Sequence, residues 1–439
     1  MRVVVNDANI NRKASDFLSG DGMHLNETEK RMLGGKFGKA PELAMNILSE
    51  LGELYGAERM IEISQVHIDM TLYMVDAGVE FAEKMADLGG RFAVPAQLNP
   101  ASIDLIRHET LRVPKNLLEK SRRLETAYLK MGAIATWTCA PYQQGLIPSF
   151  GEQIAWGESN AVAFVNSVIG ARTERYADLT DICAAITGRV PALGLHLTAN
   201  RKAEILLALK DIPENTFNDS RIYPLLGYIF GEIAGDRIAA LEGIPKQVTM
   251  DNLKSFAAAA ASSGAVGLFH VLGVTPEAPD LQTCFRNGKP EKTIVITPEM
   301  IDAAASRLNQ GACSVPDLIT LGCPHYSVDE FKTLAKLLNS RKIKDGMEFW
   351  VFTSRKTYAE IKALNFLEKI ERSGVKVFTD GCSLQYPQEN WDFTCAMSDS
   401  VKYANYCFSQ TGLNVIFSGT RDCVETAVSG ELRRELLWK

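Results

Sequence analysis

The chain has 439 residues, of which 46% are hydrophobic and 23% charged, and its formal net charge is −6. This balance is typical of a globular protein, and it excludes a disordered chain, a collagen-like chain and a small disulfide scaffold. Acidic side chains outnumber basic ones, so a nucleic-acid backbone is not the expected main partner.

The first 26 residues are polar and irregular. We expect an N-terminal extension over 1–26 and a catalytic region over 27–439, in two or three α/β lobes. The extension lacks the apolar core of a secretory signal, which predicts a cytoplasmic protein. A first helix is predicted over 41–56, because Pro41 suits its first turn and Gly56 suits its end. Its buried face is predicted from the helical spacing of four apolar residues: Leu43, Ile47, Leu51 and Leu54.

Short apolar runs then alternate with segments that are long enough for helices, such as 328–341. The runs are rich in Val, Ile, Phe or Trp and have the length of strands: 60–68, 91–97, 132–140, 266–273, 317–323, 347–354, 375–382 and 414–419. This alternation predicts an α/β fold of mostly parallel sheets flanked by helices. Ligands bind at the carboxyl ends of strands in such sheets, so the residues that close each run are candidates for the site.

One segment, 256–274, has no Asp, Glu, Lys or Arg over a length that could span a membrane. It consists largely of Ala and is interrupted by Ser262, Gly264 and His270. A buried helix that runs into a buried strand fits this composition better, and we expect no membrane partner.

The chain has 9 cysteines, at positions 139, 183, 284, 313, 323, 382, 395, 407 and 423. Their number is odd, no pair has the spacing Cys-x-x-Cys, and no export signal is evident, so we expect no disulfides. The spacings do not resemble a zinc ribbon either. A small buried hydrophobic side chain is the ordinary interpretation of each of them.

Three cysteines end predicted strands and are followed by turn residues: Cys139, Cys323 and Cys382. On separate strands of parallel sheets, the three thiols could converge on one crevice. An iron–sulfur cluster is normally held by four cysteines, so three cysteines would leave one iron open to substrate. Spacing alone cannot group widely separated thiols, and three unrelated core cysteines are the alternative.

Several long motifs, in this order along the chain, resemble one family: TWTCAPYQ (136–143), WGESNAVAFVNSVIGARTERYADL (156–179), SSGAVGLFHVLGVTPEAP (262–279), LITLGCPHYS (318–327) and TDGCSLQ (379–385). Together they resemble the large catalytic part of aconitase X, from about Leu25 to Val428. The resemblance implies an aconitase-like arrangement of domains 1–3. It also implies that Cys139, Cys323 and Cys382 hold an iron–sulfur cluster, [4Fe–4S] or [2Fe–2S], and that the other cysteines belong to the core.

Members of this family are hydro-lyases that dehydrate a hydroxylated acid. By resemblance, Lys402, Glu158 and Ser159 are candidate catalytic residues. Asn99 and Pro100 are implied to bind substrate. Lys402 would hold the substrate carboxylate and stabilise the charge that develops as the Cα proton leaves. A solvated lysine, an exposed turn carboxylate and a helix cap are the ordinary alternatives for the three candidate catalytic residues.

The segment VHIDMTLY (66–73) departs from the family branch that dehydrates 5-phosphomevalonate. That branch has Gly-Val-Ser where this chain has Asp69, Met70 and Thr71, which are therefore candidate substrate-binding residues. An aspartate would repel a phosphate, but it could pair with the secondary ammonium of cis-3-hydroxy-L-proline, the substrate of another branch. Capping of the next helix is the alternative role for Asp69.

Two histidines lie near these motifs. His67 is a candidate substrate-binding or supporting residue. His325, two positions after a candidate ligand, could orient a cluster sulfur or a substrate oxygen. A core histidine with satisfied hydrogen bonds is the alternative for both.

Family members close a small swivelling domain with a serine base over the cluster, and the resemblance leaves no segment of that size. We therefore expect a small-subunit partner. The leading hypothesis is the large subunit of a cis-3-hydroxy-L-proline dehydratase, with Δ1-pyrroline-2-carboxylate as product and the open iron as Lewis acid. The alternatives are dehydration of another hydroxy acid, such as 5-phosphomevalonate, or a non-catalytic cluster-bearing scaffold. The acidic balance and the lack of a basic run count against a scaffold that binds RNA.

Overall fold

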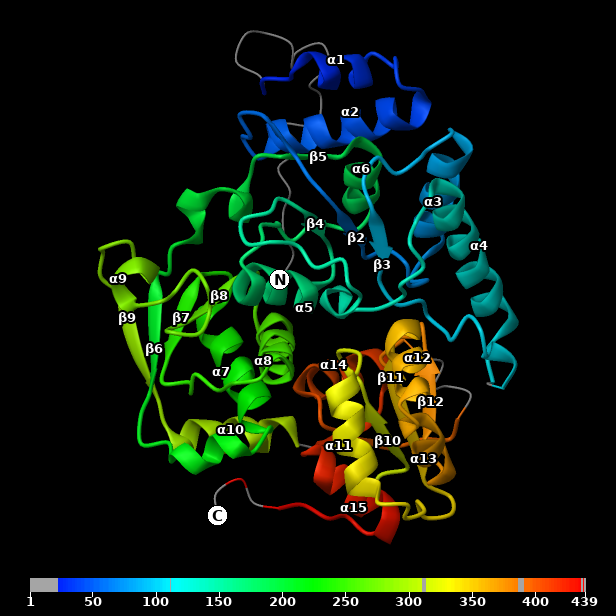
Figure 1. The fold of residues 1–439 in the computed structure, drawn as a ribbon, viewed down its shortest axis with the longest axis vertical. Helices are drawn as coiled ribbons and strands as arrows, with labels where there is room; N and C mark the ends of the chain where they lie inside the picture. The colour runs from blue at the N-terminus through cyan, green and yellow to red at the C-terminus, as the bar shows by residue number, and fades with distance from the viewer. Residues whose placement is uncertain (1–22, 111, 310–312, 386–390, 436, 438–439) are drawn as a thin grey trace, which may run out of the picture.

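The computed structural model describes residues 23–110, 112–309, 313–385, 391–435 and 437. Three sheets of parallel strands, each accompanied by helices, make up most of the described chain (Figure 1). This architecture confirms the predicted α/β class. Of the predicted extension, residues 1–22 lie outside the described part, and Asn26 caps α1 (Glu27–Leu33).

The first sheet has the strand order β3-β2-β4, and its pairs are parallel. A separate antiparallel pair joins β1 to β5. The strands of the first sheet are buried along their whole length, as expected for a parallel sheet that is covered on both faces. The elements of this part are α2 (Lys39–Leu54), β1 (Met60–Glu62), β2 (Val66–Ile68), α3 (Asp76–Asp87), β3 (Ala96–Leu98), α4 (Lys115–Met131), β4 (Ala155–Trp156), α5 (Ser159–Phe164), α6 (Thr180–Thr187) and β5 (Arg189–Pro191).

The second sheet has the order β8-β7-β6-β9, also parallel. Its elements are β6 (Ile205–Leu209), α7 (Ile222–Ala234), β7 (Ala239–Glu242), α8 (Met250–Ser263), β8 (Phe269–Val271), α9 (Leu281–Cys284), β9 (Lys292–Ile296) and α10 (Pro298–Leu308). Helices α7 and α8 pack so closely that only glycine fits at position 227. A Cβ there would lie 2.3 Å from the carbonyl oxygen of Phe256. The expected buried helix and strand over 256–274 are confirmed as α8 and β8. Within the described residues, no helix is both long and apolar enough to cross a membrane.

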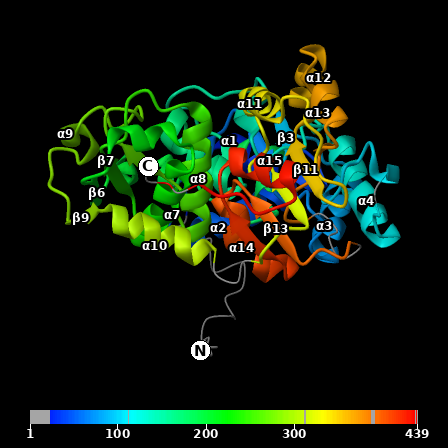
Figure 2. The ribbon, with the colours of Figure 1, turned by 90° about the horizontal axis from the view of Figure 1, so that it is seen from below.

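The third sheet has five parallel strands in the order β12-β11-β10-β13-β14. Its elements are β10 (Leu318–Leu321), α11 (Val328–Leu338), β11 (Glu348–Thr353), α12 (Arg355–Ala363), α13 (Phe366–Arg372), β12 (Lys376–Thr379), β13 (Cys395–Ser398), α14 (Val401–Thr411), β14 (Asn414–Phe417) and α15 (Thr420–Ser429). Both faces of this sheet are buried: Phe349 and Val351 pack into one apolar cluster, and the alternating Trp350 and Phe352 into another. Viewed from below, α14 lies beside the helices of the second sheet, and it contacts α8 (Figure 2).

Backbone hydrogen bonds join the first and third sheets. After β3, the Ala101 N–H donates to the Asp380 carbonyl at 2.7 Å, and the Cys382 N–H donates to the Ala101 carbonyl at 3.1 Å. The buried carboxylate of Asp104 accepts the Thr379 N–H at 3.0 Å. The segment that follows β3 is therefore fixed against the segment that follows β12.

The helix predicted over 41–56 is present as α2, but the predicted buried face is wrong at one end. Leu54 is 75% exposed. The face that is fully buried carries smaller residues, among them Ala40 and Ala44, and packs against α6. The apolar pattern fits two faces of the helix, and close packing of small side chains selects one of them.

The run predicted as a strand over 132–140 is not a strand. Its backbone runs along β3 and makes isolated hydrogen bonds to it. The Ile134 N–H donates to the Ala96 carbonyl, and the Thr138 N–H donates to the Leu98 carbonyl. Between them Trp137 has a φ of 44°, which is incompatible with a continuous ladder. The other predicted runs overlap strands, but 60–68 divides into β1 and β2, and 91–97 reaches only the first two residues of β3.

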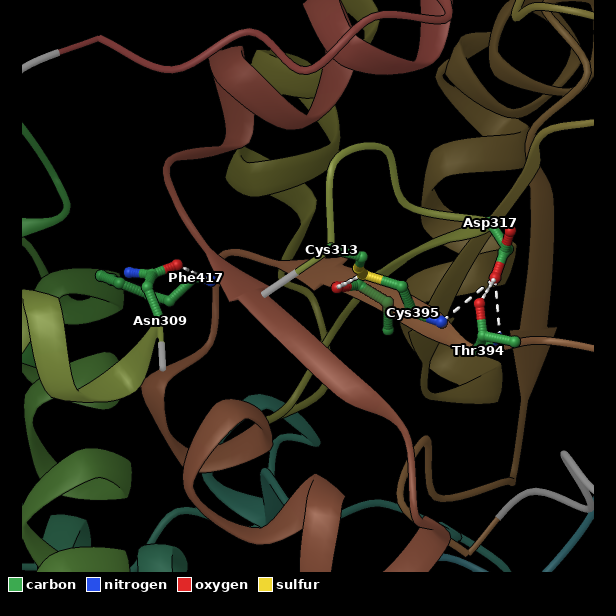
Figure 3. The surroundings of a disulfide bond; sticks show 7 residues. Asn309, Cys313, Asp317, Thr394, Cys395 and Phe417 are labelled. Carbon is green, nitrogen blue, oxygen red and sulfur yellow. Dashed lines mark hydrogen bonds between the residues drawn. A yellow bond between two sulfur atoms is a disulfide. The ribbon is translucent and has the colours of Figure 1, made fainter. Parts of the chain in front are cut away.

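The expectation of no disulfides is wrong for one pair. Cys313 is bonded to Cys395, with Cα atoms 6.3 Å apart (Figure 3). Beside the bond, Asp317 Oδ2 accepts hydrogen bonds from the backbone and the side chain of Thr394, each at 2.7 Å. Cys395 begins β13, so the disulfide lies at the amino edge of the third sheet. Four further cysteines are buried and unbonded, as predicted: Cys183, Cys284, Cys407 and Cys423.

Candidate active site

One cavity, of about 810 Å³, is lined by most of the site residues predicted from the sequence. They are Asp69, Asn99, Pro100, Cys139, Glu158, Ser159, Cys323, Cys382 and Lys402, together with His325. The residues come from the first and third sheets and the segments next to them. Loops that precede strands of the second sheet add Asp236 and Ala265 to the wall.

The carboxyl ends of all three strands of the first sheet carry polar side chains into this cavity. Asp69 directly follows β2, Asn99 directly follows β3, and Glu158 lies in the turn after β4. The Nδ2 amide of Asn99 donates hydrogen bonds to Asp69 Oδ1 and, at 3.1 Å, to Glu158 Oε2. The three strand ends are therefore connected through one buried amide.

The third sheet adds two cysteines in the same way. Cys323 follows β10 after Gly322, and Cys382 follows β12 after a short turn. Gly322 has a φ of 96°, and a Cβ there would lie 2.2 Å from the carbonyl oxygen of Phe352. Only glycine therefore allows the chain to turn so close to β11 and present Cys323 at the sheet edge.

His325 connects the segments that carry the three cysteines. Its backbone N–H donates to the Cys139 sulfur at 3.3 Å, and its ring contacts Thr138 Oγ1 at 3.0 Å and the Gly381 carbonyl at 2.9 Å. The carbonyl can only accept, so Nε2 carries the proton and Nδ1 accepts from the threonine. Burial lowers the pKa of His325 to about 4, which keeps the ring neutral. His325 is thus a positioning residue for all three segments.

The three thiols are half-buried and unbonded. Burial raises the pKa of Cys323 to about 12 and also raises the pKa of Cys139 and of Cys382. Iron binds the thiolate form and so offsets the cost that burial places on the charge. Backbone N–H groups also point at the sulfurs, from His325 to Cys139 and from residues 384 and 385 to Cys382.

This donor set suits a cluster better than a single ion. Among the described residues, no three His, Cys, Asp or Glu side chains are grouped so as to hold one metal ion. A cluster makes a different demand, because its cysteines are distributed over two or more iron atoms, and N–H donors to sulfur are part of such sites. Three thiols around one cavity, with N–H groups aimed at two of them, meet that demand.

Lys402 forms a buried ion pair at the edge of the cavity. It lies in the first turn of α14, and its Nζ donates to Glu158 Oε1 at 2.5 Å and to Asn160 Oδ1 at 2.7 Å. Burial alone would raise the pKa of Glu158, but the Lys402 ammonium outweighs it and lowers that pKa to about 2. The lysine pKa is raised by the same pairing against the effect of burial. Both partners are therefore charged at neutral pH.

The pKa of Asp69 is shifted in the opposite direction to that of Glu158. Burial raises the pKa of Asp69 well above its usual range, and the nearby carboxylates of Glu158, Asp178 and Asp181 raise it further. The capping alternative for Asp69 is wrong, because the next helix, α3, begins at Asp76 with Val75 as its N-cap. Asp69 is available to the cavity instead.

Three predicted substrate-binding residues do not line the cavity. Thr71 Oγ1 donates to the Pro100 carbonyl at 2.8 Å, and Met70 packs against α3. The Nε2 of His67 contacts the Thr138 carbonyl at 2.8 Å, and burial lowers the pKa of this ring to about 4. These side chains support the wall of the cavity from behind.

Other residues of the cavity were missed by the sequence reasoning. Asn160 Nδ2 donates to the Cys139 carbonyl at 2.8 Å while its Oδ1 accepts from Lys402, so it ties a candidate ligand to the lysine. Arg175 and Asp178, from the loop before α6, also line the cavity. Both lie within a family motif, but their charges alone do not distinguish them from surface residues.

Comparison with known proteins assigns most of the described region to one family. The models of the aconitase X first, second and third domains match residues 22–199, 203–306 and 316–429. A cis-3-hydroxy-L-proline dehydratase of Pseudomonas aeruginosa is 40% identical over 95% of this chain and 72% of the relative. A protein of the same name from Hypocrea jecorina is 38% identical over 94% of this chain and 70% of the relative.

Two further matches cover almost the full length of the other protein. The phosphomevalonate dehydratase large subunit of Methanosarcina mazei is 36% identical over 94% of this chain and 99% of the relative. The crystal structure of Thermococcus kodakaraensis aconitase X in its holo-form superimposes with a TM-score of 0.83 and 32% identity, covering 92% of this chain and 100% of that one. The chain therefore belongs to the aconitase X family. Its similarity to named dehydratases over most of its length identifies it as a hydro-lyase that acts on a hydroxy acid.

Proposed function

We propose that this chain is the cluster-bearing large subunit of a hydro-lyase that dehydrates cis-3-hydroxy-L-proline to Δ1-pyrroline-2-carboxylate. The observation that carries the proposal is the content of one cavity: three half-buried thiols, a buried lysine and several carboxyl groups. The relatives from P. aeruginosa and H. jecorina, at 40% and 38% identity, are named for this activity.

In this proposal Cys139, Cys323 and Cys382 hold an iron–sulfur cluster, [4Fe–4S] or [2Fe–2S]. Three cysteine ligands leave one iron open, and the bound cluster supplies a Lewis acid for the departing hydroxyl group. The N–H groups that face the sulfurs support this assignment.

The protein's own residues would handle the charge on the substrate. Removal of the Cα proton places negative charge next to the carboxylate, and the Lys402 ammonium stabilises that charge. Glu158 holds the ammonium in place and stays ionised, so it cannot serve as an acid at neutral pH. Ser159 donates to Glu158 Oε1 at 3.1 Å and fixes the carboxylate in turn. The base that takes the Cα proton is assigned to the serine of the swivelling domain.

The partner is proposed to be a small subunit that carries this swivelling domain. The chain covers 99% of the M. mazei large subunit but only 72% and 70% of the two hydroxyproline dehydratases. Those two relatives therefore contain a segment that the match to this chain does not cover. We also propose that the three matched ranges correspond to three lobes of the catalytic region. The cytoplasmic location remains a prediction from the sequence.

The test is co-expression of this chain with a small subunit, anaerobic purification and a panel of hydroxy acids followed by ultraviolet absorbance. We expect turnover of cis-3-hydroxy-L-proline by the assembled enzyme and none by this chain alone. A cluster-loaded complex that leaves cis-3-hydroxy-L-proline unchanged would refute the substrate. Full activity of this chain without a second polypeptide would refute the partner.

Dehydration of 5-phosphomevalonate is the second candidate. It is favoured by the almost complete coverage of the phosphomevalonate dehydratase large subunits, which reaches 99% for M. mazei and 100% for Methanocaldococcus jannaschii. The carboxyl groups around Asp69 count against it, because a phosphate placed there meets like charge. Turnover of 5-phosphomevalonate in the same panel would decide in its favour.

A further inference from the structure

Asp69 is surrounded by titratable groups from several elements. They are Glu158 after β4, Asp178 before α6, Asp181 on α6, Lys402 on α14 and Tyr128 on α4. The Asp69 backbone N–H donates to the Asp181 carboxylate at 2.6 Å, and Glu158 is paired with Lys402. The carboxyl groups of Glu158 and Asp181 are thus already engaged, whereas Asp178, which is exposed, interacts with Asp69 through its side chain.

Asp69 and Asp178 form a carboxyl pair. Their side chains lie within hydrogen-bonding reach of each other, and both line the cavity. An ionised carboxylate can only accept a hydrogen bond, so the two can bond to each other only when one of them carries a proton. Burial raises the pKa of both groups, and the charge of Glu158 raises it further. The cavity without substrate therefore favours a shared proton between them.

Asn99 gives a second and independent sign of what binds beside this pair. Its side chain is fully buried, lines the cavity, and donates through Nδ2 to both Asp69 and Glu158. Glu158 stays ionised and can only accept, so it fixes the orientation of the amide, whose oxygen points away from it. The Oδ1 atom is left buried with no hydrogen-bond donor. A ligand that brings N–H donors to this place would satisfy it.

We propose that Asp178 is a further specificity-determining residue, and that the Asp69–Asp178 pair exchanges its shared proton for the secondary ammonium of the substrate. The proton leaves to solvent, and the ammonium replaces it as the positive charge between the two carboxylates. This inference rests on the proposed function and adds a recognition site for the nitrogen of the substrate to it. A secondary ammonium carries two N–H donors, which match the carboxyl pair and the free Asn99 oxygen. A phosphate offers neither a donor nor a positive charge.

The first test needs no variant. The assembled holoenzyme is titrated calorimetrically with L-proline, which lacks the leaving hydroxyl, and with tetrahydrofuran-2-carboxylate, in which an ether oxygen replaces the ammonium. We expect L-proline to bind at least about tenfold more tightly, the size of one charge-assisted hydrogen bond. Titrations in buffers of different ionisation enthalpy should show release of about one proton per L-proline near neutral pH. Equal affinities, or binding of L-proline without proton release, would overturn the inference.

The second test uses Asp178→Asn, which keeps the shape of the side chain and removes its charge. L-proline should bind about tenfold more weakly to this variant, and proton release should be lost. Asp236→Asn is the matched control, because Asp236 comes from the loop before β7 and lines the same cavity. It removes one charge without contact to the pair, so proton release should persist. Proton release retained in Asp178→Asn, or lost in Asp236→Asn, would contradict the assignment.

The two proposals fail in different ways. Turnover of cis-3-hydroxy-L-proline without proton release on L-proline binding would leave the proposed function intact and remove the carboxyl-pair inference. Lack of turnover, with L-proline bound and a proton released, would remove the proposed substrate and leave an amino-acid site. Because the comparison of L-proline with its oxygen analogue uses the native enzyme, the inference is tested even if Asp178→Asn does not fold.

Discussion

The first and third sheets contribute to the cavity in a way that the second sheet does not. The first and third sheets turn their carboxyl edges to it, with Asp69 and Asn99 from one and Cys323 from the other. The second sheet contributes the loops before β7 and β8, at Asp236 and Ala265, and no residue directly after its described strands lines the cavity. The same parallel architecture thus lines the cavity with strand-end side chains at one edge and with loop residues at the other, and strand-end binding predicts ligands at the first.

The largest expected effect comes from removal of a thiol at the carboxyl edge. Cys323→Ser should strip iron and colour from the anaerobically purified protein, and the same change at Cys139 or Cys382 should do so as well. Metal analysis and the visible spectrum are the measurements. Cys183→Ser and Cys407→Ser serve as controls, because these thiols are buried, do not line the cavity and should leave iron unchanged. Full iron retention in Cys323→Ser would remove the cluster assignment.

Loss of the ammonium should be the next largest effect. Lys402→Ala is expected to lower kcat by at least about 100-fold, the scale of one lost charge-stabilising donor, with iron content unchanged. The change also leaves Glu158 buried without its cation, so a thermal unfolding curve must accompany the kinetics. A folded variant with near-native turnover would show that this ion pair is only structural.

Asp69→Asn tests the carboxyl edge of the first sheet. It should lower kcat/KM for cis-3-hydroxy-L-proline by about 10- to 150-fold, the equivalent of one charge-assisted hydrogen bond.

Because the folded protein raises the pKa of Asp69, the native state binds its proton more tightly than the unfolded chain does. Stability therefore falls as pH rises from the acid range through this raised pKa, and the non-ionising Asn should lose less stability over that range. Unfolding temperatures of the cluster-free protein in acid and at neutral pH would measure this, and parallel curves for the two proteins would contradict it.

His325→Ala tests whether the cysteine segments need their common support. Loss of the contacts to Thr138 and Gly381 should weaken iron retention about 10- to 100-fold, the range seen for residues that orient metal ligands. The measurement is iron remaining after competition with a chelator. His67→Ala is the comparison, because His67 contacts the Thr138 carbonyl but not the Gly381 segment, and should lose less iron. Equal retention in both variants would reduce His325 to a core histidine.

The smallest effect is expected at the amino edge of the second sheet. Asp236→Asn should change kcat/KM by no more than about twofold, as for an ordinary surface substitution. Steady-state kinetics on the assembled enzyme give the value. A loss comparable to that of Asp69→Asn would mean that the second sheet also takes part in substrate recognition. The difference between the second sheet and the other two would then not hold.

The sequence predicted four of the five strands of the third sheet, because strands buried on both faces are continuous apolar runs between turns, but β13 was not among the predicted runs. It predicted a strand at 132–140 wrongly, since an apolar segment beside β3 has the same composition whether or not it forms a ladder. Resemblance supplied the three cysteines and Lys402, whereas Asp178 has no local pattern of its own. Nor could spacing pair Cys313 with Cys395, which are 82 positions apart.

The contacts of His325 also bear on when the site can form during synthesis of the chain. Its ring reaches Thr138, which lies 187 positions earlier, and Gly381, which lies 56 positions later. On the ribosome the candidate ligands emerge one after another, and Cys382 is the last of them. Under the proposed assignment, the complete set of three cysteine ligands comes together only after the long-range contacts of the fold have formed, so iron would be inserted after that step. A factor that delivers iron would then meet a folded protein and not an unfolded segment.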